Sequence, residues 1–146
     1  MGTHFTPEDE QLLRESGRSL SFARGELLIR EGQNLPGVRL IRSGTVRVVR
    51  QHLGKEVSIA TLGAGESFGE ISFLDQSGAS ASVVADEDVV VDFLSNSDLA
   101  KLFTASPALA ARFFRAIALT LAERLRETSA MVPLLLCRRG GHDTQD

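Results

Sequence analysis

Hydrophobic and polar residues follow two different periods along this chain. Between residues 20 and 94 the residues alternate in short runs, at Val38–Ile41, Val57–Thr61 and Val89–Phe93. Alternation with a period of two is typical of β-strands, and glycines separate these runs at turn positions. Short, regularly spaced strands of this kind predict a β-sandwich or jelly roll.

Helical signals lie on both sides of the strands. The segment Thr6–Asp9 has the form of a capping box with proline at the first helical position, so a short helix is expected to about Ser16. Ser95 and Asp98 repeat the capping pattern and predict a second helix, to about Thr104. The fold class expected is therefore mainly β with flanking helices.

The last predicted helix is the longest. It opens at Ser106-Pro107 and carries an apolar stripe at helical spacing: Leu109, Phe113, Ile117, Thr120, Leu121 and Leu125. Because proline lacks a backbone N–H and clashes with the preceding turn, Pro133 is expected to end this helix after Val132. We therefore expect one domain over residues 1–130, then an apolar segment and flexible tail over residues 131–146.

Length and composition fit one soluble domain. The 146 residues can bury a sizeable core, and 16 Lys and Arg face 19 Asp and Glu, a net charge of −3. That balance argues against a dedicated nucleic-acid surface. The single cysteine, Cys137, fits a reducing compartment. Since the start is polar and no apolar run approaches the ~20 residues that span a bilayer, we expect a cytoplasmic protein without a membrane span.

One segment combines residue types suited to an anionic ligand: Phe68–Leu74, followed by Ala79–Ala81. Gly69 lets the backbone approach a ligand without a Cβ in the way. Unpaired amide N–H groups at the start of a short helix, expected over residues 70–74, suit a phosphate. The carboxylate of Glu70 can accept a hydrogen bond from a sugar hydroxyl.

This segment resembles the phosphate-binding cassette of the cyclic nucleotide-binding domain family. Upstream motifs occur in the family's order and spacing, at Glu31-Gly32, Arg42–Gly44 and Leu62–Glu66. The resemblance covers roughly residues 10–130 and implies a jelly roll with an N-terminal helix and C-terminal helices. It implies a sensor whose ligand is cAMP or cGMP. The ligand-binding residues that it implies are Gly69, Glu70, Ile71, Ser72, Ala79, Ser80 and Ala81.

The chain departs from the family pattern at one position. The family's cassette ends in Arg-Ser-Ala or Arg-Thr-Ala, whereas this chain has Ala79-Ser80-Ala81 at those positions. The family's arginine neutralises the phosphate through a forked, charge-assisted pair, which alanine cannot make. Losing one partner of a buried charged pair costs about 2–5 kcal/mol of binding free energy. The strand pattern offers Arg50 or Lys55 as substitute cations.

The long helix carries the remaining family features. Its segment 122–129 resembles the part of the cAMP receptor protein-like members that closes over the base, so Arg124 and Thr128 are the lid candidates. The alternative is an ordinary surface helix that packs on the barrel. The apolar stripe also predicts a homodimer, or a partner protein, that contacts the C-terminal helix.

Other functional classes lack the residues they need. His4, His52 and His142 do not have the spacing of metal ligands on facing strands, and no activating base is evident beside Cys137. We expect no catalytic residue, no metal and no cofactor. Residues 134–146 are too few for the helix-turn-helix domain of related transcription factors, so we expect no direct DNA binding.

Two hypotheses remain open from the sequence. The first is a non-enzymatic sensor that holds a cyclic nucleotide, or a related anion, at the cassette. The second is a structural or dimerisation module that kept the fold and binds no nucleotide. Glu70 and the cassette glycines favour the first hypothesis, and Ala79 favours the second.

Overall fold

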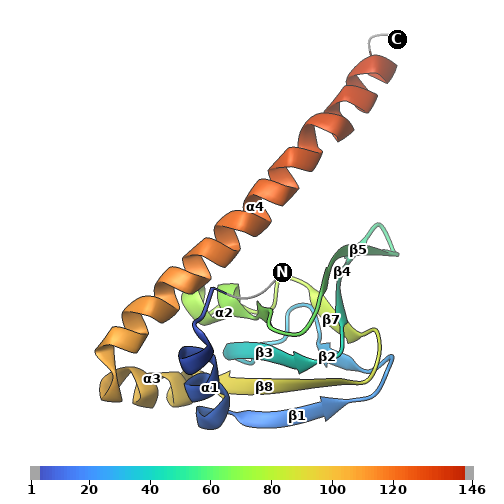
Figure 1. Cartoon of the computed structure of the whole chain (residues 1–146). Coiled ribbons are helices and arrows are strands. Elements are labelled where there is room, and N and C mark those ends of the chain that lie inside the picture. The colour runs from blue at the N-terminus through green and yellow to red at the C-terminus, as the bar shows by residue number, and fades with distance from the viewer. Residues whose placement is uncertain (1–3, 144–146) are drawn as a thin grey trace.

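The computed structural model describes the backbone of residues 4–143 and the side chains of residues 4–127. Eight strands form a sandwich, and helices precede, interrupt and follow them (Figure 1). In chain order the elements are α1 (Pro7–Ser16), β1 (Arg18–Phe22), β2 (Leu27–Ile29), β3 (Gly37–Ser43), β4 (Val46–His52), β5 (Lys55–Leu62), β6 (Ser67–Phe68), α2 (Glu70–Asp75), β7 (Ser82–Ala85), β8 (Val89–Ser95), α3 (Asn96–Ala105) and α4 (Pro107–Asp143).

The strands form two antiparallel four-stranded sheets, ordered β1-β8-β3-β6 and β2-β7-β4-β5. The side chains between the two sheets make one apolar core, because inward positions of both sheets are mostly branched aliphatic residues. This core contains Ile29, Ile41, Val46, Leu62, Phe68, Val83, Ala85, Val89 and Val91. The jelly-roll arrangement that the alternating runs predict is confirmed.

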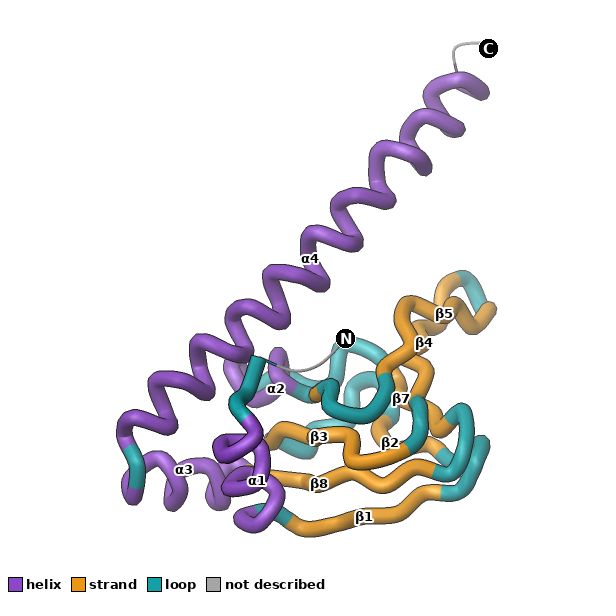
Figure 2. Tube along the Cα trace, in the orientation of Figure 1, coloured by secondary structure: helices purple, strands orange, loops and turns teal. Residues whose placement is uncertain are grey.

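A second core lies on the other face of the β1-β8-β3-β6 sheet, where α1, α3 and α4 cover it (Figure 2). Its buried members are Leu13, Val38, Leu40, Leu94, Leu99, Phe113 and Ile117. Phe113 of α4 lies at its centre, with ring centroids 5.1 Å from Phe103 and 5.8 Å from Phe73. Because Phe73 belongs to α2, this cluster joins the short helix after β6 to the long C-terminal helix.

The predicted helix starts are confirmed by their caps. The Thr6 side chain accepts a hydrogen bond from the Asp9 amide, and Ser95 and Asp98 make both bonds of a capping box. Each cap satisfies amide N–H groups that have no partner within the helix. The start of α4 at Pro107 is likewise as predicted.

The predicted end of the long helix is wrong. The backbone of α4 continues through Pro133 to Asp143 instead of ending at Val132, so a helix replaces the loose tail expected up to that residue (Figure 1). A proline inside a helix removes one backbone hydrogen bond and costs about 3 kcal/mol, but it does not forbid the helix. The strong helix formers that follow, Leu134–Leu136, favour its continuation.

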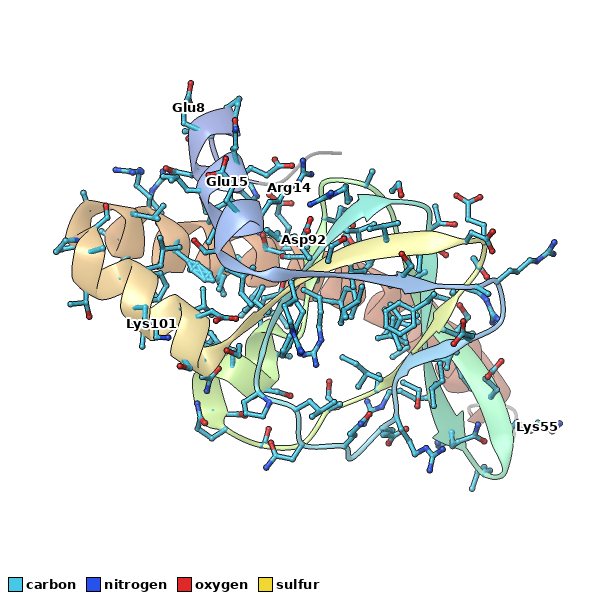
Figure 3. All side chains as sticks on the ribbon, turned by 90° about the horizontal axis from the view of Figure 1, so that it is seen from below. Glu8, Arg14, Glu15, Lys55, Asp92 and Lys101 are labelled. Atoms are coloured by element: carbon cyan, nitrogen blue, oxygen red, sulfur yellow. The ribbon has the colours of Figure 1, made fainter. Side chains whose placement is uncertain are left out.

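The alternating pattern locates the strands but not the buried side chains. Val57 and Ile59 on β5 are 46% and 53% exposed, although their pattern resembles that of a half-buried strand. In contrast, Asp92 on β8 is fully buried and accepts a hydrogen bond of 2.6 Å from Arg42. The view from below shows α1 beside Asp92, with Arg14 next to the carboxylate (Figure 3).

One ion pair ties α1 to α4. Asp9 is buried and accepts hydrogen bonds of 2.7 and 3.0 Å from the guanidinium of Arg112. These hydrogen bonds hold the pKa of the Asp9 carboxyl below its ordinary value of 3.8. The forked geometry is the strong form of a charge-assisted contact.

Replacing Asp9 with asparagine should lower the free energy of unfolding by about 1–3 kcal/mol at pH 7, because Arg112 loses its charged acceptor. The folded-state pKa of Asp9 lies below the unfolded value, so the pair stabilises the fold above about pH 4 and loses its effect as the pH falls through the folded pKa. Urea unfolding at neutral and acid pH measures both effects. Glu87→Gln, at an exposed turn position, is the control. Equal losses for the two variants would contradict the assignment.

Candidate functional site

The turn between β6 and α2 forces a glycine at position 69. Gly69 has a φ of +91°, in the left-handed region, and serves as the residue before the first turn of α2. A Cβ at this position would lie 2.9 Å from the carbonyl oxygen of Gly37 and 3.1 Å from Nη1 of Arg39. Glycine is therefore required here both by backbone conformation and by the close approach of β3.

Helix α2 buries two of its cassette side chains and exposes two. It spans Glu70–Asp75, one residue beyond the predicted end. Glu70 and Ser72 are buried, whereas Ile71 and Leu74 are about half exposed. A six-residue helix cannot bury a carboxylate without a partner, because the desolvation cost would exceed what such a helix contributes. The partner of Glu70 must therefore come from elsewhere in the chain.

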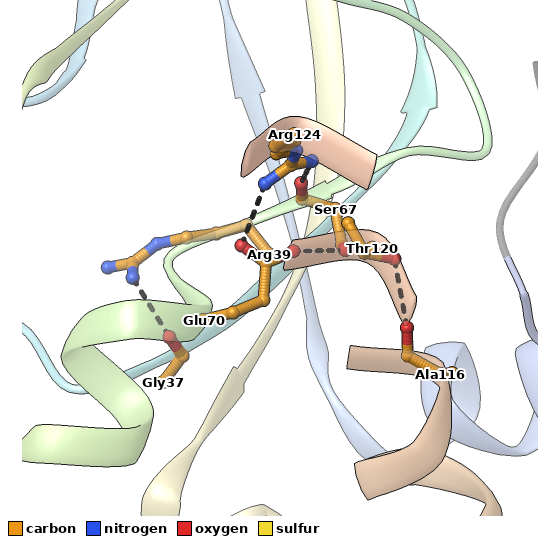
Figure 4. A network of polar contacts seen from close by, with 7 residues as sticks. All are labelled: Gly37, Arg39, Ser67, Glu70, Ala116, Thr120 and Arg124. Carbon is orange, nitrogen blue, oxygen red and sulfur yellow. Dashed lines mark hydrogen bonds and ion pairs between the residues drawn. The ribbon is translucent and has the colours of Figure 1, made fainter. Parts of the chain in front are cut away.

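Arg124 of α4 is that partner (Figure 4). Its Nη1 donates a hydrogen bond of 3.1 Å to Oε1 of Glu70, whose side chain is 2% exposed. Its Nη2 donates to the backbone carbonyl of Ser67, and the Ser67 hydroxyl donates to Oε2 of Glu70. One guanidinium thus clamps α4 onto both β6 and α2. We call Ser67, Glu70 and Arg124 the cassette clamp.

The contacts of the clamp do not fill every hydrogen-bond acceptor position of the Glu70 carboxylate. A carboxylate has about four lone-pair positions, and the contacts with Arg124 and Ser67 occupy two of them. The side chain is held in a single orientation by donors on both oxygens. The carboxylate is therefore fixed in orientation, with two lone-pair positions that these contacts do not fill.

Backbone hydrogen bonds and small buried side chains position the Ala79–Ala81 segment. The Ala79 amide donates to the carbonyl of Gln33 at 2.9 Å, and its carbonyl accepts from Gly32 at 2.8 Å. The Ala79 side chain packs against the core between the sheets, Ala81 is buried, and the Ser80 side chain is exposed. The backbone of the cassette is thus in place without the arginine, and position 79 supplies no charge.

The structure places the two predicted substitute cations differently on the β4–β5 hairpin. Lys55 lies at the tip of the β4–β5 hairpin and points away from the body of the protein (Figure 3). Arg50 is exposed on β4, opposite Val57, and directly follows Val49, whose partner on β7 is Ser82, the residue after the cassette. No contact of either side chain with the cassette is found among the described residues. Of the two lid candidates, Arg124 reaches the cassette, while the side chain of Thr128 lies outside the described residues.

Sequence reasoning missed Ser67. This buried residue on β6 contacts both charged members of the clamp, one through its hydroxyl and one through its carbonyl. The sequence pattern gives little indication of this role, because a serine before Phe68 is typical of an ordinary polar strand position. The role of Ser67 in the clamp depends on its contact with Arg124, which lies 57 residues later in the sequence.

Two kinds of feature are not found among the described residues. They bring together no group of three His, Cys, Asp or Glu side chains that could hold a metal ion. Within the same part of the chain, no helix has the length and apolar character that crossing a membrane requires.

Comparison with known proteins agrees with this geometry. The sequence model of the cyclic nucleotide-binding domain matches residues 19–106, more than half of the chain. The cyclic AMP receptor protein of Thermus thermophilus is 36% identical over 130 residues, which cover 88% of this chain and 58% of the relative. The chain thus spans less than two thirds of that relative's length.

Solved structures give the same result. The crystal structure of the Thermus thermophilus catabolite activator protein is 36% identical, with a TM-score of 0.75 over 90% of this chain and 60% of that chain. The structure of a cyclic nucleotide-binding domain from Methylobacillus flagellatus is 29% identical, with a TM-score of 0.79 over 88% and 74%. With its matching sequence, its jelly roll and its intact β6–α2 turn, the chain belongs to the cyclic nucleotide-binding domain family.

Proposed function

We propose that this chain is a non-enzymatic regulatory domain that binds a cyclic nucleotide, cAMP or cGMP, at the cassette with reduced affinity. The cassette clamp supports this proposal, because it holds the buried Glu70 carboxylate in one orientation beside the β6–α2 turn. The ribose hydroxyl of the nucleotide donates to Glu70. The phosphate lies against the backbone of Gly69–Ser72 and the exposed hydroxyl of Ser80.

Reduced affinity follows from Ala79. The family's arginine position carries a methyl group that packs on the core, so the cassette segment itself offers the phosphate only amides and a hydroxyl. The loss of a charged partner corresponds to about 2–5 kcal/mol, or on the order of 30- to 4,000-fold in affinity.

Signal output would run through α4. Arg124 joins α4 to Glu70, and Phe73 joins the same helix to α2 through Phe113 and Phe114. A ligand that adds a donor to Glu70 changes the electrostatic balance of the clamp and shifts the population of docked α4. The distal part of α4 extends beyond the sandwich, where a second copy or a partner protein can read its position (Figure 1).

The alternative function is a dimerisation module that binds no nucleotide, and Ala79 is the observation that favours it. In that case the clamp is a fixed structural contact that holds α4 in one position. Leu125, which is exposed on α4 one residue after Arg124, then serves a permanent protein interface.

Calorimetric titration with cAMP and cGMP separates the two functions, and Ala79→Arg sharpens the result. If only the missing cation limits binding, this variant raises the affinity at least tenfold, about 1.4 kcal/mol. Gln51→Arg adds the same charge on the exposed hairpin and should leave the affinity unchanged. Silence of both the wild type and Ala79→Arg would support the dimerisation module and overturn the sensor.

The cassette clamp predicts an energetic coupling between Glu70 and Arg124. Arg124→Met leaves a buried carboxylate without its cation and should lower the free energy of unfolding by about 2–4 kcal/mol. In Glu70→Gln the loss on adding Arg124→Met should be smaller, giving a coupling of about 1–3 kcal/mol in a double-mutant cycle measured by urea unfolding. Arg126→Met, at an exposed position of α4, is the control. Strict additivity would show that the clamp contributes nothing.

Dimerisation through α4 predicts a concentration-dependent sedimentation coefficient. Leu125→Glu places a charge at an exposed apolar position of the helix and should shift the equilibrium to monomer, while Arg126→Glu changes a neighbouring exposed position as the control. Sedimentation velocity of the three proteins over a range of concentrations measures the shift. A wild-type protein that stays monomeric at high micromolar concentration would contradict this interface.

A further inference from the structure

A cavity of about 200 Å³ lies on the inner face of the β1-β8-β3-β6 sheet. Its walls are mostly apolar and include Leu20, Leu28 and Val91, while Arg18 and Arg39 supply two positive charges. No acidic side chain is among the described residues that line it. Because Arg18 and Leu35 on its rim are exposed, the cavity opens to solvent on that side.

Arg39 is a buried cation whose hydrogen-bonding capacity is only partly used. Its residue is 7% exposed, and its Nη1 donates to the backbone carbonyls of Leu35 and Gly37, at 3.1 and 3.3 Å. A guanidinium has five N–H donors, so several remain available. No carboxylate in the described part of the chain lies within ion-pair distance of Arg39. Burial lowers the pKa of Arg39 to about 10, which still leaves it charged at neutral pH.

Arg18 brings a second cation to the same wall. Arg18, Phe93 and Arg39 are register partners across β1, β8 and β3, so their side chains share one face of the sheet. The guanidinium carbons lie 5.8 Å and 4.5 Å from the centroid of the Phe93 ring. The result is a phenyl ring between one deep and one exposed guanidinium. An isolated buried cation is costly, so this wall is electrostatically suited to an anion.

We propose that this cavity binds a small carboxylate whose apolar part is a single ring or a short branched chain. Arginine pairs with carboxylates through a planar fork, and both guanidinium groups can contribute to one anion. A dry cavity of roughly 150 Å³ holds benzene, so the volume here suffices for one ring with its carboxylate. Drug-sized ligands occupy about 300–1,000 Å³, which makes a whole nucleotide too large.

The cavity is a separate site from the cassette. It shares only Phe68 with the cassette segment, and none of the three clamp residues lines it. Figure 4 shows the Arg39 side chain pointing to one side, toward Gly37, and the Glu70 side chain directed toward Arg124. The two sites nonetheless share a wall, since Arg39 Nη1 lies close to the position that a Gly69 Cβ would take.

Benzoate is the probe that tests this site, with benzamide as its neutral counterpart of the same shape. In a titration of the labelled full chain followed by NMR, benzoate should produce saturable shifts at Leu20, Leu28 and Val91. Benzamide should bind at least tenfold more weakly, because it lacks the charge that the guanidinium groups recognise. No saturable shift at these residues, or equal affinity for the two probes, would overturn the proposal.

Variants assign the recognition to the two arginines. Arg39→Met keeps the apolar stem and should weaken benzoate at least tenfold, whereas Arg18→Met should weaken it severalfold. Arg30→Met, an exposed position outside the cavity, should have no effect. If Arg39→Met does not fold, the wild-type contrast between the probes and the Arg18→Met result still decide. Unchanged affinity in Arg18→Met, or in a folded Arg39→Met, would contradict the assignment.

Discussion

The contact of Arg124 with Glu70 is the interaction on which the functional geometry depends. Glu70 sits in a helix of six residues and is almost fully buried, so its carboxylate must be paired or the local fold would not form. The only element that brings a cation to it in the described structure is α4. The orientation of the cassette and the docking of the long helix therefore depend on the same contact.

The family pattern has an arginine where this chain has Ala79, so this chain keeps the clamp and lacks the cassette cation. Ala79 retains its backbone hydrogen bonds with Gly32 and Gln33, so the loop geometry does not depend on the arginine. Replacing arginine with Ala79 removes the charge-assisted pair with the phosphate, and such a pair contributes strongly to anion affinity when the site is desolvated. A second pair of cations, Arg18 and Arg39, lies instead on the inner face of the sandwich.

Local signals made much of the fold and part of the site predictable from the sequence. Caps at Thr6 and Ser95 act over three residues, and the cassette is a contiguous segment with its own turn geometry. The missed features depend on partners distant in sequence. Asp92 and Arg39 occupy polar positions in strand patterns, yet both are buried, because α1 covers one and the second sheet faces the other. The continuation of α4 past Pro133 reflects a balance between one lost bond and strong neighbouring helix formers.

One guanidinium couples the cassette to α4, and amide hydrogen exchange in Arg124→Met measures that coupling. Exchange reports the local free energy of opening for each segment. Protection should fall together in α2 and in the part of α4 around position 124, while the strands β1, β8 and β3 should keep their protection. Loss of protection in α4 alone, with α2 unchanged, would contradict the coupling.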